Sequence, residues 1–269
     1  MKLTYFGTAA AEGFPAVFCR CRHCLEARRL GGKNIRTRSQ AMIGEDLLID
    51  FPADTYMHFL QNRVEGDRIR YLLVTHPHSD HLCTSDLGMR FGAYAHEMRE
   101  ETLRILCPEA AAAKIGRAPL GTEVTVLRAF ETVELGEYRI TPLPARHMGV
   151  DESFIYLIEG DRTLLYAHDT GYFFEEVFAY LEEQKIHLDA ISLDCTNGAT
   201  GVSDEGRHMG FANIERVLSR LASFGAVTDK TTRIVNHFSH NVAPLQHLLE
   251  EKAAPLGCLV AYDGYLVEF

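Results

Sequence analysis

Hydrophobic and polar positions along the chain follow two different periods. Short apolar or alternating runs predict strands near residues 2–7, 40–50, 70–75, 104–107, 123–143, 153–167, 188–193, 232–236 and 258–269. Apolar residues at helical spacing predict helices near residues 22–31, 53–62, 109–116, 173–184, 210–223 and 243–252. Strand groups that alternate with single helices favour an α/β protein in which helices cover sheets.

The length and composition of the chain are typical of one globular unit. With 269 residues, of which 46% are hydrophobic, the chain can bury a large core, and we expect residues 1–269 to form a single domain. No apolar run is long enough for a signal peptide or a membrane span. We therefore expect a cytoplasmic protein without a membrane partner, and the sequence is compatible with a homodimer.

The charge of the chain disfavours a long nucleic acid as substrate. The formal net charge is −10, from 37 acidic and 27 basic residues, and this would repel a polyanion. One group of basic residues lies near the N-terminus. We interpret it as a solvated helix and loop, with a local anion site as the alternative; its members are Arg20, Arg22, Arg28, Arg29, Lys33, Arg36 and Arg38.

A dense group of potential metal ligands follows the predicted strand at residues 70–75. His76, His78, Asp80 and His81 lie within one short segment. Imidazole and carboxylate groups together suit zinc and similar divalent ions, and more than four such ligands in one site would hold two metals. The rest of the chain must therefore supply further ligands.

Further polar residues occur directly after predicted strands. They are His147, Asp169, Asp194 and His237. A loop that leaves a sheet can hold such residues over a shared cleft. Singly each is typical of a capping or hydrogen-bonded loop residue, but together with the His-Asp segment they indicate one metal site.

The order of these residues resembles the ligand set of the metallo-β-lactamase superfamily. The matching positions are His76, His78, Asp80, His81, His147, Asp169 and His237. The resemblance implies a four-layer αβ/βα sandwich with a dinuclear site at the edge of two facing sheets. It also implies that Asp50, at the end of a strand, supports a ligand without binding metal itself.

The resemblance assigns each ligand to a metal. His76, His78 and His147 would hold the first ion; Asp80, His81 and His237 would hold the second. Asp169 would bridge both. Superfamily members with a redox di-iron centre usually carry glutamate at the second motif position, so His78 points to hydrolysis with zinc or manganese.

Three close cysteines form a second candidate metal site. Cys19, Cys21 and Cys24 can wrap one tetrahedral ion but leave it one ligand short. The chain has seven cysteines, and an odd number crowded in this way fits a reducing compartment and a zinc-binding loop at about residues 19–24 better than disulfides. Candidates for the fourth ligand are His23, Cys83, Cys195 and His240, with His23 disfavoured by its place inside the turn.

The cysteine segment carries a narrower resemblance. With Gly7-Thr8 and the His237 to His240 segment, it resembles the phosphoribosyl cyclic phosphodiesterase branch associated with carbon-phosphorus lyase. This resemblance implies that His240 completes one structural zinc site. It also implies that His208, downstream of Asp194, assists catalysis without binding metal.

Together these features lead us to expect a dinuclear metal-dependent hydrolase. Its expected substrate is a small cyclic or nucleotide-like phosphodiester, attacked by a hydroxide that bridges the two metals. Asp80 would orient the nucleophile and His208 would steady or protonate the leaving oxygen. The alternatives are a tRNA-processing-type nuclease, a thioester or lactone hydrolase, and a noncatalytic cofactor-biosynthesis protein.

Overall fold

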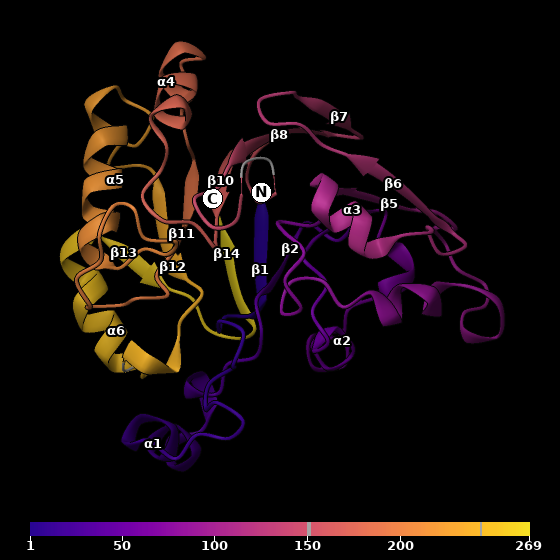
Figure 1. Ribbon diagram of the computed structural model, residues 1–269, viewed down its shortest axis with the longest axis horizontal. Coiled ribbons are helices and arrows are strands. Elements are labelled where there is room, and N and C mark those ends of the chain that lie inside the picture. The colour runs from indigo at the N-terminus through magenta and orange to yellow at the C-terminus, as the bar shows by residue number, and fades with distance from the viewer. Residues whose placement is uncertain (150–151, 243) are drawn as a thin grey trace.

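The chain forms two facing β-sheets flanked by helices (Figure 1). The computed structural model describes residues 1–149, 152–242 and 244–269. Within these residues the first sheet has the strand order β14 (Tyr265–Glu268), β1 (Lys2–Gly7), β2 (Gln40–Ile43), β3 (Leu47–Ile49), β4 (Tyr71–Leu73), β5 (Leu103–Cys107) and β6 (Thr122–Val126). The second has the order β13 (Cys258–Val260), β12 (Thr232–Asn236), β11 (Ala190–Asp194), β10 (Thr163–Ala167), β9 (Phe154–Glu159), β8 (Tyr138–Pro144) and β7 (Val133–Leu135).

The helices lie close to the segments that helical spacing predicted. They are α1 (Arg22–Leu30), α2 (Thr55–Asn62), α3 (Glu109–Ile115), α4 (Glu175–Glu183), α5 (Phe211–Ser223) and α6 (Gln246–Ala253). Short 3-10 turns join them at η1 (Gly32–Asn34), η2 (Gly66–Arg68), η3 (Thr84–Arg90), η4 (Gly92–Tyr94), η5 (His240–Val242) and η6 (Ala254–Leu256). Among the described residues, no helix is long and apolar enough to cross a membrane.

Side-chain alternation along the strands creates the layers. In β4, Tyr71 and Leu73 pack into the core between the two sheets, whereas Leu72 packs on the outer face of the first sheet. In β10, Tyr166 faces the same central core and Leu165 faces the helices of the second sheet. Successive residues of a strand point to opposite faces, so wholly apolar strands need cover on both sides.

Helices supply that outer cover. Ala111 of α3 is buried against the first sheet, while Val177 of α4, Ile214 of α5 and Leu249 of α6 are buried against the second. Burying each large aliphatic side chain stabilises the fold by roughly 1.5–3 kcal/mol. The four layers are therefore helix, sheet, sheet and helix, which confirms the predicted αβ/βα sandwich.

The strand directions bring loops from both sheets to one edge. Strands β3 to β6 run parallel to one another, and so do β10 to β13. Parallel neighbours end on the same side of a sheet, where their loops meet. The N-terminal arm (residues 8–38), which contains α1, extends below the two sheets in the view of Figure 1. Phe14, Cys24 and Ala27 of the arm form a small core with Leu245, which precedes α6.

Candidate metal centre

Loops from the ends of four strands bring the predicted ligands together. His76 and His81 follow β4, His147 follows β8, Asp169 follows β10 and His237 follows β12. Two groups result, in each of which the potential ligand atoms lie within 4.8 Å of one another. The groups are His76, His78 and His147, and Asp80, His81, Asp169 and His237.

The first group is a triangle of imidazoles. The Nδ1 atom of His78 lies 2.9 Å from Nε2 of His76 and 3.0 Å from Nε2 of His147. His76 and His147 are buried, whereas His78 is exposed. This group can therefore hold a cation with one side of the site open to solvent.

Asp169 lies between the two groups. Its Oδ2 atom is 2.6 Å from Nε2 of His81 and 3.4 Å from Nε2 of His76. The Oδ2 atom of Asp80 lies 3.4 Å from the same nitrogen of His81. A carboxylate that reaches both groups has the position that a bridging ligand requires.

Hydrogen bonds behind the site orient two of the imidazoles. Nδ1 of His81 lies 2.7 Å from Oδ2 of Asp50, and the Thr75 amide donates to Oδ1 of Asp50 at 2.8 Å. Nδ1 of His76 lies 3.0 Å from Oγ1 of Thr75. Occupying Nδ1 in this way turns Nε2 of each ring towards the site, as in carboxylate-supported metal ligands.

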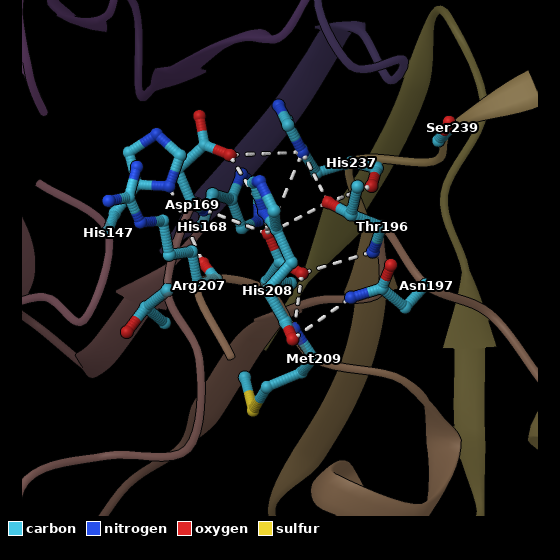
Figure 2. Close-up of polar contacts among 12 residues, drawn as sticks. His147, His168, Asp169, Thr196, Asn197, Arg207, His208, Met209, His237 and Ser239 are labelled. Carbon is cyan, nitrogen blue, oxygen red and sulfur yellow. Dashed lines mark hydrogen bonds and ion pairs between the residues drawn. The ribbon is translucent and has the colours of Figure 1, made fainter. Parts of the chain in front are cut away.

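Two further imidazoles are held in the same manner. Nδ1 of His237 lies 2.8 Å from Oγ1 of Thr196, and Nδ1 of His147 lies 3.4 Å from the Arg207 carbonyl oxygen. Figure 2 shows Thr196 beside His237, with Asp169 nearby. Each ring therefore has a protein contact on Nδ1. Nε2 of His147 faces His78, whereas His237 lies 3.4 Å from Asp169 through the same Nδ1 atom.

The pKa shifts of Asp169 and His76 favour their metal-binding forms. Burial would raise the pKa of Asp169, but the imidazoles of His237 and His81 outweigh it and hold this pKa well below the ordinary value. Burial lowers the pKa of His76 well below its ordinary value. Ionised carboxylates and neutral imidazoles are the forms that bind metal. Burial also lowers the pKa of His81, but Asp50 and Asp169 outweigh it and raise this pKa well above its ordinary value.

Several buried atoms of the cluster need a further partner. Within the described residues, Nε2 of His237 is buried without a hydrogen bond. Nε2 of His81 and Oδ1 of Asp169 also make no hydrogen bond of good geometry, although each lies within ion-pair distance of a neighbouring group. An unsatisfied buried polar group costs about 1–3 kcal/mol, and a cation would supply the missing interaction. Nitrogen and carboxylate donors suit zinc and related divalent ions. The cluster is thus consistent with a dinuclear metal site, and the assignment of each ligand stays a prediction.

His208 reaches the cluster from the loop between β11 and α5. Its Nδ1 atom lies 3.2 Å from Oδ1 of Asp169 and 3.2 Å from Oδ2 of Asp194, and 27% of its side chain is exposed. Burial lowers its pKa, but Asp194 and Asp169 override this effect and raise the pKa to about 9. Figure 2 shows His208 in the same cluster as Asp169 and His237.

Asp194 has a supporting role that the sequence did not assign. Its Oδ1 atom accepts hydrogen bonds of 3.0 Å from the amides of Thr196 and Met209. Its Oδ2 atom accepts one of 3.1 Å from the Asp169 amide. Its place after a predicted strand marked Asp194 as a site candidate, but Thr75 and Thr196 carried no such signal.

The cysteine segment gathers around His240. Sulfur atoms of Cys19, Cys21 and Cys24 and a ring nitrogen of His240 all lie within 4.8 Å of one another. The Cys24 amide donates to Sγ of Cys21 at 3.5 Å, and this contact lowers the pKa of Cys21 to about 6. Three thiols and an imidazole match a tetrahedral zinc site. This group could hold a structural metal.

The other candidates for the fourth ligand lie outside this group. The His23 ring accepts a hydrogen bond of 3.1 Å from Arg22, its neighbour in sequence. Cys83 and Cys195 belong to none of the ligand groups found among the described residues. The geometry therefore favours His240, and the zinc assignment itself stays a prediction.

Known proteins share this architecture. The family model described as a beta-lactamase superfamily domain matches residues 47–235, which is most of the chain. No curated protein matches the sequence. Among solved structures, a diphosphatase of the PhnP family is 22% identical, with a TM-score of 0.73 and coverage of 100% of this chain and 97% of that chain.

Two further structures have a similar fold. Zinc-bound PqqB from Methylobacterium extorquens is 17% identical, with a TM-score of 0.71 and 100% coverage of both chains. The short form of human tRNase Z is 14% identical, with a TM-score of 0.65 and coverage of 100% of this chain and 99% of that chain. At these identities the likeness shows the fold alone. The family match and the fold together place this protein in the beta-lactamase superfamily, as a metallo-β-lactamase-fold hydrolase with a buried His-Asp cluster.

Proposed function

We propose that this protein hydrolyses a small cyclic or nucleotide-like phosphodiester at the His-Asp cluster. The observation that carries the proposal is the position of His208, whose ring adjoins Asp169 while part of its side chain stays exposed. A proton donor beside a cation site is suited to a reaction in which an alkoxide leaves a phosphorus atom. The similarity to a diphosphatase of the PhnP family supports a substrate with a phosphoryl group.

The cluster has a buried side and an open side. His81 and Asp169 are almost completely buried, whereas His78 is exposed and His208 is partly exposed. A substrate would approach over His78 and His208. Its phosphoryl group would then lie over the two ligand groups, and its leaving oxygen would face His208.

The proposed chemistry divides between the ions and the chain. Two divalent cations would neutralise charge on the phosphoryl oxygens and lower the pKa of water. Asp169 and Asp80 would hold the two ions at a fixed separation. Asp194 binds Nδ1 of His208 and so directs the other ring nitrogen, Nε2, away from the carboxylates and towards a leaving oxygen, to which it would donate a proton.

A substrate panel tests this proposal. Purified protein, reconstituted with zinc or manganese, would be assayed with bis-p-nitrophenyl phosphate, cyclic nucleotides, cyclic sugar phosphates, thioesters and lactones. We expect turnover of phosphodiesters that disappears in an Asp169→Asn variant. Faster turnover of thioesters or lactones, or equal turnover by the variant, would contradict the proposal.

The identity and number of the ions need a separate measurement. Anomalous scattering at the zinc edge, with elemental analysis of the same sample, would locate and count them. We expect two ions at the His-Asp cluster and one zinc at the cysteine group. A cluster that takes up no metal on reconstitution would support a noncatalytic role instead.

A further inference from the structure

An exposed aromatic side chain stands at the N-terminal arm. Phe18 is 100% exposed and Val17 is 64% exposed, although both lie only a few residues from the small core of the arm. They line a hollow of about 490 Å³ together with Glu12, Ala16, Cys19 and Arg38. This volume lies within the range of roughly 300–1,000 Å³ that small-molecule sites occupy.

One wall of the hollow is attached to the metal-site loop of the second sheet. The Oε1 atom of Glu12 accepts hydrogen bonds from Oγ of Ser239 at 2.6 Å and from the amide of His240 at 3.1 Å. The Ala10 amide donates to the carbonyl oxygen of Phe238 at 3.1 Å. These partners directly follow His237, so hydrogen bonds tie this wall to the loop that carries a predicted metal ligand.

The other wall is attached to a loop of the first sheet. Arg38 donates from Nη1 to the Asp54 carboxylate at 3.1 Å, and its amide donates to the same group at 3.0 Å. Asp54 lies in the turn that follows β3 and Asp50. The hollow therefore lies where loops from both sheets come together, the edge that also carries the His-Asp cluster.

Polar atoms remain available at the rim of this apolar hollow. Arg38 uses Nε for the Ala11 carbonyl and Nη1 for Asp54. Within the described part of the chain, its Nη2 atom and the Oε2 atom of Glu12 make no hydrogen bond. The hollow thus offers an aromatic face, a donor and an acceptor. A nucleobase has the complementary features, a flat π-face and an edge of donors and acceptors.

We propose that this hollow is a nucleobase subsite of the phosphodiesterase. The base stacks on Phe18, and its edge meets Arg38 and Glu12, while the phosphodiester lies at the His-Asp cluster. The inference rests on the proposed function, which it narrows to substrates that contain a nucleoside. An aromatic platform accepts any base, so it selects nucleotides over plain sugar phosphates without selecting one base strongly.

The absence of tryptophan from the sequence allows a direct binding test. The chain contains no Trp, so a Phe18→Trp variant carries a single reporter at the hollow. We expect adenosine monophosphate to quench its fluorescence saturably and ribose 5-phosphate to leave it unchanged. A Phe91→Trp variant is the matched control, because Phe91 is 51% exposed and lies outside the hollow.

Several results would overturn the subsite. The first is equal quenching of Phe18→Trp by adenosine monophosphate and by ribose 5-phosphate. The second is equal quenching of the Phe91→Trp control by adenosine monophosphate. The third is a change in fluorescence that follows the protein concentration and not the ligand concentration. The last would indicate a second copy of the chain in the hollow. Quenching by adenosine monophosphate in a protein that hydrolyses no phosphodiester would overturn the proposed function alone.

Kinetics give an independent test. Phe18→Ala removes the aromatic ring on which the base would stack, so KM for a cyclic nucleotide should rise by about 10-fold. The value of kcat should stay nearly unchanged. The same variant should hydrolyse a cyclic ribose phosphate like the parent protein. Because Phe18 is fully exposed, its replacement does not remove packing from the fold. An unchanged KM for the nucleotide would refute the subsite while leaving phosphodiester hydrolysis intact.

Discussion

Replacing Asp50 with asparagine should weaken metal binding much more than it weakens the fold. The Asp50 carboxylate accepts from the Thr75 amide at 2.8 Å and lies 2.7 Å from Nδ1 of His81. Asparagine can still accept from Thr75 through its carbonyl oxygen. Its amide group, however, would donate to Nδ1 of His81 and thereby place the ring proton on Nε2, the atom that faces the site. A protonated Nε2 cannot bind a cation.

The expected magnitude follows from the position of Asp50 behind a ligand. Loss of such a partner typically costs 10–100-fold in metal affinity, or about 1.4–2.7 kcal/mol. The free energy of unfolding of the metal-free protein should fall by only about 1–3 kcal/mol, because one charge-assisted hydrogen bond is lost. Both quantities can be compared with the parent protein by competition with a chromogenic chelator and by urea denaturation.

The matched control is Asp46→Asn, since Asp46 is a partly buried aspartate beside the first sheet that accepts from the Tyr138 hydroxyl at 3.1 Å. This control should change stability modestly and leave metal affinity unchanged. If Asp50→Asn retained both ions at the cluster with parental affinity, the proposed orientation of His81 by Asp50 would be refuted.

Three other substitutions address the remaining parts of the site. Asp169→Asn should abolish turnover with circular dichroism close to that of the parent, and unchanged turnover by the pure variant would exclude Asp169 from the centre. His208→Gln should lower kcat by about 10²–10⁴-fold with full metal content by elemental analysis, because it removes only a proton donor; loss of an ion would instead make His208 a ligand. Cys24→Ser should remove one metal equivalent and lower Tm, while the ions at the His-Asp cluster remain. Equal metal content in that variant would argue against the structural zinc.

Much of the fold was predictable because the central strands have cover on both faces. The run at residues 71–74 is continuously apolar, and β4 indeed packs on both sides. The ligands were also visible in the sequence, since Asp169 and His237 lie within two residues of the ends of such runs. The segments η3 and η4 were not predicted, because 3-10 turns have neither the helical nor the strand period.

Interactions that depend on distant parts of the chain could not be predicted. Thr196 and His237 are 41 residues apart in sequence, and only the pairing of β11 with β12 brings their loops together. The interpretation of the N-terminal basic residues as a solvated surface is wrong for Arg36, which is buried. Arg36 donates to Oγ1 of Thr8 at 2.8 Å and to the Ala261 carbonyl at 2.7 Å. A guanidinium in a polar network has the same sequence signature as one in solvent.

The backbone at the site shows how strand ends become ligand positions. Asp50, Asp169 and His237 all have positive φ angles, of 64°, 48° and 62°. Asp50 and His237 are the first residues beyond their strands and Asp169 is the second beyond β10, and at each the left-handed conformation turns the chain sharply out of the sheet. This conformation costs roughly 1–3 kcal/mol for a residue other than glycine. Hydrogen bonds that these residues make to Thr75, Asp194 and Thr196 offset the cost. Glycine at these positions would relieve the strain but would remove the side chains that form the site at this edge.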